Sequence, residues 1–350
     1  MAKESLIYNP AEEIDNIVSS LNPDKVLIVT DSNVADLVMP KLDSSKTLKE
    51  NAWFVMTPGE ENKNLNTVTQ IWDKLEDLGA TRQSVVINIG GGVVTDLGGF
   101  VASTFKRGIR TINFPTTLLG AVDAATGGKT GIDYNGLKNE IGVFHQPSKV
   151  IVSSLPFSTL PHSEILSGYA EMIKTSLISD RELYIKLLDI DKVLSDEELL
   201  GEAVVACVNI KNEVVAQDPE EKGLRKILNF GHTAGHAFES LRGKSNNPVS
   251  HGKAVAHGIF VALILSRMKL GFPSEEVHYY RNFLKKNYEN PLIECPQVPI
   301  ILEFMASDKK NFHYGQPLFT LLKEIGEPEI NCEVTDSELT EALEIYLSAF

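Results

Sequence analysis

The sequence predicts an α/β nucleotide-binding domain followed by a mostly α-helical domain. In the first half, short β-branched runs alternate with helical patterns, whereas the periodicity from Ser163 onwards is mostly helical. A length of 350 residues fits two domains of about 150 residues each. Proline residues punctuate Ser154–Pro161, so we place the boundary there and expect domains at 1–160 and 161–350.

Three short apolar runs in the first half have the length and β-branched content of buried strands. They are Val26–Thr30, Val85–Ile89 and Thr111–Phe114. Between the first two, Leu65–Leu78 has apolar residues at helical spacing and stops at Gly79. Strands and helices that alternate in this way predict a parallel sheet.

The second half shows helical periodicity in five long segments, without an internal repeat. The expected helices are Ile165–Ile178, Leu199–Ala216, His232–Leu241, Gly252–Leu270 and Ser274–Asn287.

The charge of the chain limits its partners. Lysine and arginine number 33 against 47 acidic residues, which gives a net charge of −14 and argues against nucleic acid and anionic membranes. The three cysteines, Cys207, Cys295 and Cys332, are widely spaced and form no CxxC pair, which favours a reducing compartment. We find no secretory signal and no apolar run long enough to span a bilayer, and therefore expect a cytoplasmic protein.

A glycine-rich loop follows the second expected strand. Gly90-Gly91-Gly92 precedes a helical pattern that contains a second glycine pair, Gly98-Gly99. Glycines let the backbone adopt positive φ and approach a ligand closely, and a helix N-terminus offers free N–H groups to phosphate. We expect a pyrophosphate site, although the GxGxxG fingerprint is absent. The alternative is a turn that only packs helix on sheet.

Positive charge gathers in residues 100–150 of an otherwise acidic chain. This segment holds six basic residues, Lys106, Arg107, Arg110, Lys129, Lys138 and Lys149, against Asp123, Asp133 and Glu140. Lys129 stands among glycines, which favours binding of a phosphorylated substrate. A solvated face with no ligand is the alternative.

Three segments contain side chains suited to a divalent metal. His232 and His236 are four residues apart and share a helix face, His251 lies near a helix start, and Glu171 is surrounded by apolar residues. Two histidines and one glutamate with an open position are typical of catalytic zinc. Hydrogen-bonded structural histidines and an ordinary Glu171–Lys174 ion pair remain the alternative.

Taken in order, these motifs resemble the 3-dehydroquinate synthase family from about Asp31 to Asn311. The matching segments are Gly90–Gly92, Asp96–Ser103, Arg107-Gly108, Pro115–Leu119, Asp123, Gly127–Thr130, Gly168–Lys174, Asn229–His232 and Asp308–Asn311.

The resemblance implies an N-terminal Rossmann-like domain, a helical metal- and substrate-binding domain, and a homodimer. It implies a lyase of the shikimate pathway, and so of chorismate and aromatic amino acid biosynthesis. The enzyme would convert 3-deoxy-D-arabino-heptulosonate 7-phosphate to 3-dehydroquinate and phosphate. The implied steps are transient oxidation by NAD, β-elimination of phosphate, re-reduction, ring opening and intramolecular aldol closure.

The resemblance also assigns residues to ligands. A divalent metal, zinc or alternatively cobalt, is assigned to Glu171, His232 and His251. NAD is assigned to Asp31, Asn33, Glu60, Lys63, Gly91, Gly92, Val93, Asp96, Thr116, Thr117, Leu119, Lys129, Lys138, Thr159, Leu160 and Glu164. The catalytic and substrate-binding set is Arg107, Asp123, Lys129, Lys138, Asn139, Lys174, Lys211, Arg225, Asn229, His236 and Lys310.

Three other functions are compatible with parts of this pattern. A metal-dependent polyol dehydrogenase would share the two-domain plan but needs no phosphate site. Another sugar-phosphate cyclase would differ in its substrate residues, and a nucleotide-binding pseudoenzyme would lack metal ligands. The chain also departs from the family at Gly136-Leu137, where the family commonly has a single glycine before Lys-Asn. This insertion concerns the local loop shape.

Overall fold

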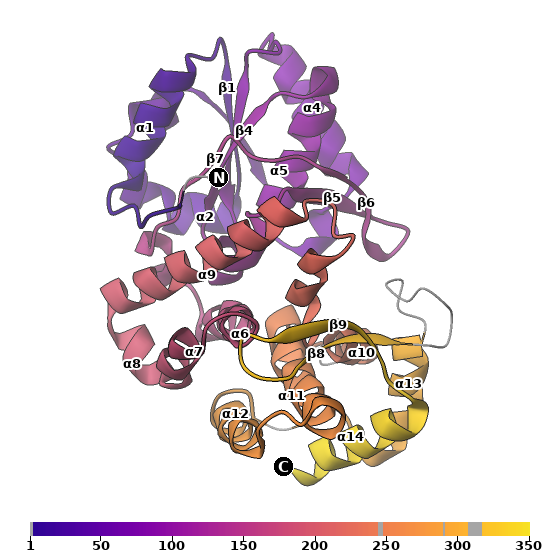
Figure 1. The fold of residues 1–350 in the computed structure, drawn as a ribbon. Helices are drawn as coiled ribbons and strands as arrows, with labels where there is room; N and C mark the ends of the chain where they lie inside the picture. The colour runs from indigo at the N-terminus through magenta and orange to yellow at the C-terminus, as the bar shows by residue number, and fades with distance from the viewer. Residues whose placement is uncertain (1–2, 244–247, 290, 307–316) are drawn as a thin grey trace. The chain divides into compact units, whose positions relative to one another are not determined.

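The computed structural model describes residues 3–243, 248–289, 291–306 and 317–350. The chain forms two compact units (Figure 1). The first unit contains Met1–Ile165 and Glu197–Asn212, and the second contains Leu166–Asp196 and Glu213–Phe350. Helix α9 (Glu197–Gln217) therefore belongs mostly to the first unit, although the sequence analysis assigned it to the helical domain.

A five-stranded parallel sheet forms the centre of the first unit, which confirms the expected α/β class. The strand order is β2-β1-β3-β4-β7. All neighbouring strands in this order are parallel. The strands are β1 (Val26–Asp31), β2 (Ala52–Met56), β3 (Val85–Gly90), β4 (Arg110–Pro115) and β7 (Lys149–Val150).

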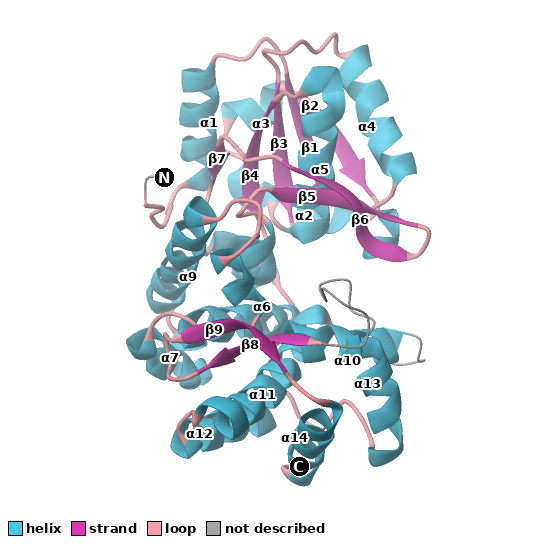
Figure 2. Cartoon of the chain, turned by 45° about the vertical axis from the view of Figure 1, so that its right-hand side comes forward, coloured by secondary structure: helices cyan, strands magenta, loops and turns pink. Residues whose placement is uncertain are grey.

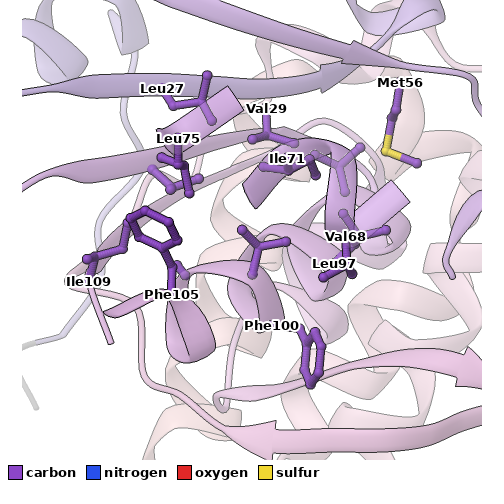
Figure 3. Packing of buried hydrophobic residues seen from close by; sticks show 14 of the residues in the cluster. Leu27, Val29, Met56, Val68, Ile71, Leu75, Leu97, Phe100, Phe105 and Ile109 are labelled. Atoms are coloured by element: carbon purple, nitrogen blue, oxygen red, sulfur yellow. The ribbon is translucent and has the colours of Figure 1, made fainter. Parts of the chain in front are cut away.

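Helices cover both faces of this sheet (Figure 2). Leu27 and Val29 of β1 point to one face, where they pack with the helices α4 (Leu65–Asp77) and α5 (Gly92–Thr104) (Figure 3). Val26 and Ile28, the alternate residues of β1, pack on the other face. The helices on that face are α1 (Pro10–Leu21), α2 (Ser32–Leu37) and α3 (Lys46–Glu50). Burial on both faces explains why the strands are continuous apolar runs.

The first unit also contains a β-hairpin that the sequence analysis did not predict. It consists of β5 (Lys129–Tyr134) and β6 (Leu137–Phe144), which pair antiparallel. Asn135 and Gly136 form its turn, with φ of 50° and 79°. Gly136 thus supplies a turn residue and Leu137 begins the strand, which settles the local shape of the segment with the extra residue.

The second unit is mostly helical, as the periodicity predicts. Helix α11 (His251–Leu270) is deeply buried, because every residue from Ala254 to Ser266 is buried. The other helices and strands are α6 (His162–Leu177), α7 (Arg181–Leu188), α8 (Ile190–Ser195), α10 (His232–Gly243), α12 (Ser274–Asn287), α13 (Val298–Ala306), α14 (Asp336–Ser348) and the hairpin β8 (Leu318–Leu322) with β9 (Pro328–Glu333). None of the described helices combines the length and apolar character that a bilayer span requires.

Candidate functional site

The glycine loop connects β3 to α5, as expected, but its conformation differs from the prediction. None of Gly90–Gly92 has a positive φ, so that part of the prediction is wrong. The structure instead requires these glycines for space. A Cβ on Gly91 would lie 3.0 Å from Thr117 Cγ2, and one on Gly92 would lie 3.1 Å from Ala124 Cβ. The backbone N–H groups at the start of α5 are therefore left uncovered by side chains at these two positions.

Many of the residues assigned to NAD gather at one edge of the sheet. Because β1, β3 and β4 are parallel, Asp31, Gly91 and Thr116 all lie at the carboxyl ends of their strands. Ligands of open α/β sheets bind at this edge. Burial raises the pKa of Asp31, although the backbone N–H groups of Val34 and Asn33 partly offset the effect. The residues placed at or just after these strand ends are Asp31, Asn33, Gly91, Gly92, Val93, Thr116, Thr117 and Leu119.

Five more of the residues assigned to NAD lie in or beside two 3-10 helices and at the start of α6, while Asp96 lies in α5 and Lys129 and Lys138 lie in the β5–β6 hairpin. Glu60 begins the 3-10 helix Glu60–Asn62, which comes after β2, and Lys63 directly follows this helix. Thr159 and Leu160 end the 3-10 helix Leu155–Thr159, and Glu164 lies in the first turn of α6.

Lys63 is a buried lysine at the centre of a polar cluster. Its side chain is only 3% exposed, and its Nζ lies 2.6 Å from Asp96 Oδ2, 2.5 Å from Asn139 Oδ1 and 3.7 Å from Glu60 Oε1. Burial raises the pKa of Asp96 to about 6, even though the charge of Lys63 lowers it. The structure thus brings three residues assigned to NAD together with Asn139, which was assigned to the substrate.

The hairpin residue Asp133 connects this cluster to the backbone. The Asn139 N–H donates to Asp133 Oδ1 at 2.8 Å, and the Asp133 N–H donates to the Lys63 carbonyl at 2.8 Å. Asn139 has φ of 51°, a backbone conformation that asparagine tolerates better than most residues. Asp133 therefore holds Asn139 in position beside Lys63, a role that the sequence analysis missed.

In the first unit, the buried Lys211 also pairs with Asp123, whose side chain is 32% exposed. Lys211 Nζ lies 2.5 Å from both the Oδ1 and the backbone carbonyl of Asp123. Asp123 belongs to a π-helical turn (Gly120–Ala124), and Lys211 comes from α9. Two residues assigned to the substrate, 88 positions apart, are therefore in direct contact.

The other basic residues of the first unit are more dispersed. Lys129 and Lys138 are exposed on β5 and β6. Arg107 lies just after the C-terminal end of α5, a helix of 13 residues and about 20 Å, whereas Gly92 begins it. The structure therefore does not bring Arg107 to the glycine loop of the same chain.

In the second unit, Glu171, His232 and His251 converge on one point. One ligand atom from each lies within 4.8 Å of the others. The Nε2 atoms of both histidines are 3.5 Å from Glu171 Oε1, and the Glu171 side chain is 1% exposed. These residues come from α6, α10 and α11, so the convergence is a product of helix packing.

Glycines allow these helices to approach closely. A Cβ on Gly252, next to His251, would overlap the backbone of Ser167, whose Oγ accepts a hydrogen bond from the Gly252 N–H at 3.2 Å. A Cβ on Gly258 would overlap the carbonyl of Gly231, a residue with φ of 78° that precedes His232. Helix α11 can therefore contact the backbones of both α6 and the start of α10.

Additional polar side chains surround the three converging residues. Lys174 is 2% exposed and forms an ion pair with Glu171. The ring centroid of His236 lies 5.3 Å from that of His232 and 6.1 Å from that of His251. Burial lowers the pKa of His251, but hydrogen bonds to Glu171 and Glu239 outweigh this effect and raise it to about 10.

Arg225 and Asn229 are presented by the 3-10 helix Leu224–Asn229. Arg225 is 3% exposed, and its Nη1 donates to the Pro219 carbonyl at 2.7 Å. Asp218 Oδ2 accepts the Arg225 N–H at 3.0 Å and so fixes the preceding loop. Asn229 Nδ2 donates to Glu221 Oε1 at 2.7 Å. Lys310 lies outside the described residues.

Four residues that support these groups were not predicted from the sequence: Asp133, Asp218, Glu221 and Glu239. A signal was available only for Glu239, which follows His232 by seven residues and His236 by three and therefore lies on the same helix face. The others depend on loop and hairpin geometry.

Comparison with known proteins identifies the family. The family model for the 3-dehydroquinate synthase N-terminal domain matches residues 53–167, and the C-terminal model matches 168–311. A 3-dehydroquinate synthase from Parabacteroides distasonis is 44% identical over 97% of this chain and 96% of its own. The chain belongs to the 3-dehydroquinate synthase family.

Two solved structures of other synthases are similar to this chain. A 2-deoxy-scyllo-inosose synthase complexed with carbaglucose-6-phosphate, NAD⁺ and Co²⁺ is 25% identical, covers 95% of this chain and 94% of its own, and has a TM-score of 0.82. The 2-epi-5-epi-valiolone synthase from Streptomyces hygroscopicus, with NAD⁺ and Zn²⁺ bound, is 23% identical over 100% of this chain and 99% of its own, with a TM-score of 0.85. The second likeness concerns the fold.

Proposed function

We propose that the chain is a 3-dehydroquinate synthase that converts 3-deoxy-D-arabino-heptulosonate 7-phosphate to 3-dehydroquinate and phosphate. In a member of this family, the convergence of Glu171, His232 and His251 is the observation that supports the proposal most strongly. This reaction belongs to the shikimate pathway, which supplies chorismate and the aromatic amino acids.

A divalent metal fits the residues of the second unit. Two imidazoles direct Nε2 to the same carboxylate oxygen, which is a donor set typical of catalytic zinc with an open coordination position. We propose that Glu171, His232 and His251 hold zinc, or alternatively cobalt. When bound, such a metal would lower the pKa of a substrate hydroxyl, and NAD would supply a transient hydride acceptor.

We propose that the first unit, our NAD-binding domain, holds NAD at the carboxyl edge of its sheet. The start of α5, left open at Gly91 and Gly92, offers backbone N–H groups to the pyrophosphate. Asp31 and the cluster around Lys63 supply side-chain hydrogen bonds for the rest of the nucleotide. This proposal covers the full set of residues that the resemblance assigns to NAD.

The basic residues of both units have a common electrostatic role in this proposal. In a chain of net charge −14, Lys129 and Lys138 provide local positive charge that attracts the phosphate ester and stabilises the phosphate as it leaves. Arg225 and Lys211, which are already fixed by hydrogen bonds, orient the substrate without a large loss of side-chain entropy. The resemblance adds Arg107, Asp123, Asn139, Lys174, Asn229, His236 and Lys310 to this set.

We also propose that the protein is a cytoplasmic homodimer. Support for a dimer comes from the β5–β6 hairpin, where Leu137 is 57% exposed, Phe144 55% and Tyr134 46%. Burial of these side chains against a second copy would remove apolar surface from water. The three free cysteines are consistent with a reducing compartment.

The activity is tested with purified protein, the heptulosonate phosphate, NAD and Zn²⁺. We expect equimolar release of inorganic phosphate and 3-dehydroquinate with no accumulation of NADH, because the hydride returns to the product. Accumulation of NADH without phosphate release would indicate a polyol dehydrogenase. Phosphate release from an aldohexose phosphate, but not from the heptulosonate, would indicate another sugar-phosphate cyclase.

A further inference from the structure

His251 lies between two glutamates, one on each side of its ring. Its Nε2 is 3.5 Å from Glu171 Oε1, and its Nδ1 is 3.1 Å from Glu239 Oε2. The Glu239 side chain is 19% exposed, compared with 30% for His251. Glu239 is not among the residues that the family resemblance assigns to metal, NAD or substrate.

The second histidine of the proposed metal site shows the same orientation with a different partner. His232 also directs Nε2 to Glu171 Oε1, at 3.5 Å, while its Nδ1 lies 3.2 Å from the carbonyl of Phe230. In both histidine rings, Nδ1 therefore lies near a hydrogen-bond acceptor, while Nε2 faces Glu171 Oε1. The partner of His232 is a backbone carbonyl fixed by the chain, whereas the partner of His251 is a carboxylate on a side chain.

We propose that Glu239 is a positioning residue for the metal: its carboxylate accepts the Nδ1–H of His251 and directs Nε2 to the cation. The inference rests on the proposed metal site. A carboxylate can only accept hydrogen bonds, so Nδ1 must keep its proton and Nε2 supplies the lone pair to the metal. Metal-bound histidines commonly have such a carboxylate partner, which orients the ring and increases its basicity.

The position of Glu239 on α10 places it on the same helix face as two histidines of the site. His232, His236 and Glu239 are spaced at i, i+4 and i+7, so all three lie on the helix face that meets the start of α11. One helix thus provides a proposed metal ligand at its first residue and orients a ligand of the next helix two turns later.

The test is the affinity for Zn²⁺ of the full chain, measured without substrate by competition with a chelating dye. Glu239→Gln keeps the size of the side chain but removes its charge. Because an amide can also donate a hydrogen bond, it no longer requires His251 to carry its proton on Nδ1. We expect affinity to fall 10- to 100-fold, the usual effect of losing such a partner. Glu239→Asp, which keeps the charge but shortens the reach, should retain more affinity than Glu239→Ala.

The control is Glu344→Gln, which removes the same charge from an exposed position on α14. We expect its Zn²⁺ affinity to equal that of the parent protein. Circular dichroism of the metal-free variants reports whether they fold. If a Glu239 variant unfolds, the comparison passes to the remaining folded Glu239 variants.

The outcomes separate this inference from the proposed function. A parent protein that binds Zn²⁺ tightly, with folded Glu239 variants that bind it equally well, would overturn the positioning role. A parent protein that binds no divalent metal would instead contradict the proposed metal site itself. Selective loss of affinity in the Glu239 variants, with normal affinity in Glu344→Gln, supports the role.

Discussion

The hydroxyl of Tyr346 lies 2.8 Å from Nδ1 of His257 in the interior of the second unit. The same hydroxyl accepts the Leu292 N–H at 2.9 Å, so its own proton is donated to His257. His257 is 0% exposed, and burial together with the charge of Lys253 lowers its pKa to about 3. A neutral histidine in the middle of α11 therefore connects this helix to α14.

This pair predicts loss of stability at acid pH. His257 becomes protonated near pH 6.5 in the unfolded chain but only near pH 3 in the folded chain. The free energy of unfolding is therefore unaffected by this histidine above pH 6.5 and decreases as the pH falls below that value. Between pH 7.5 and pH 5.5, the free energy of unfolding should decrease by about 1.4 kcal/mol more in the parent protein than in His257→Gln. Denaturant titrations at pH 7.5 and 5.5 measure the difference, and equal losses in both proteins would contradict it.

The proposed metal site predicts that His232→Ala loses the metal but keeps the fold. The side chain removed is a small part of the core, and its Nδ1 lies 3.2 Å from the Phe230 carbonyl, a backbone group that the substitution leaves in place. We expect less than one tenth of the parent metal content after dialysis, and loss of most activity, with an unchanged circular dichroism spectrum. Normal metal content in the variant would exclude His232 as a ligand.

The contact between α6 and α11 predicts a large effect of Gly252→Ala. The new methyl group would overlap the Ser167 backbone and push apart the helices that hold Glu171 and His251. Overpacking of this kind typically costs about 1–3 kcal/mol. We expect a lower melting temperature and weakened binding of Zn²⁺. Gly243→Ala is the control, because no atom of the described residues lies within 4 Å of its added Cβ.

The buried pair of Lys63 and Asp96 predicts strong coupling. Lys63→Met leaves the carboxylate of Asp96 with less compensation and should cost about 3–5 kcal/mol of stability. Adding Asp96→Asn should recover part of this loss, since the uncompensated charge is then absent. Urea unfolding of the parent, both single variants and the double variant gives the coupling energy; strictly additive effects would argue against the pair.

The proposed homodimer predicts a monomer after a single charge is introduced on the hairpin. Phe144→Asp places a carboxylate among exposed apolar side chains and should shift the mass in analytical ultracentrifugation from two chains to one. Ile185→Asp on α7, at a residue that is 54% exposed, is the matched control and should leave the mass unchanged. A dimer that persists in Phe144→Asp would place the interface elsewhere.

Much of the fold could be predicted because its elements have strong local patterns. The expected strand Val85–Ile89 corresponds to β3, because it is a short, mostly apolar run rich in β-branched residues. The expected helix Ser274–Asn287 corresponds to α12, because its apolar residues recur at helical spacing. The hairpin β5–β6 escaped prediction because β6 is exposed along its whole length and has no buried face to impose an alternating pattern. Its position depends on contacts such as Asp133 with Lys63, which sequence spacing does not reveal.

The proposed metal site and the glycine loop could be predicted from the sequence to different degrees. The types of side chain at Glu171 and His251 indicate metal chemistry, but their approach depends on helix packing. The spacing of Glu239 from His232 and His236 indicates a shared helix face, but its contact with His251 and the loop around Asp218 depend on tertiary geometry. The glycine loop was recognised for its close approach, while its φ angles could not be inferred from composition.

The close approach of α10 and α11 at Gly231, Gly235 and Gly258 constrains the proposed metal site. Because backbone already lies against backbone, the two helices cannot move closer together around a smaller cation. We therefore expect the preference for one ion over another to depend on the donor atoms. Engineering toward another metal should replace ligands one at a time and leave the scaffold untouched.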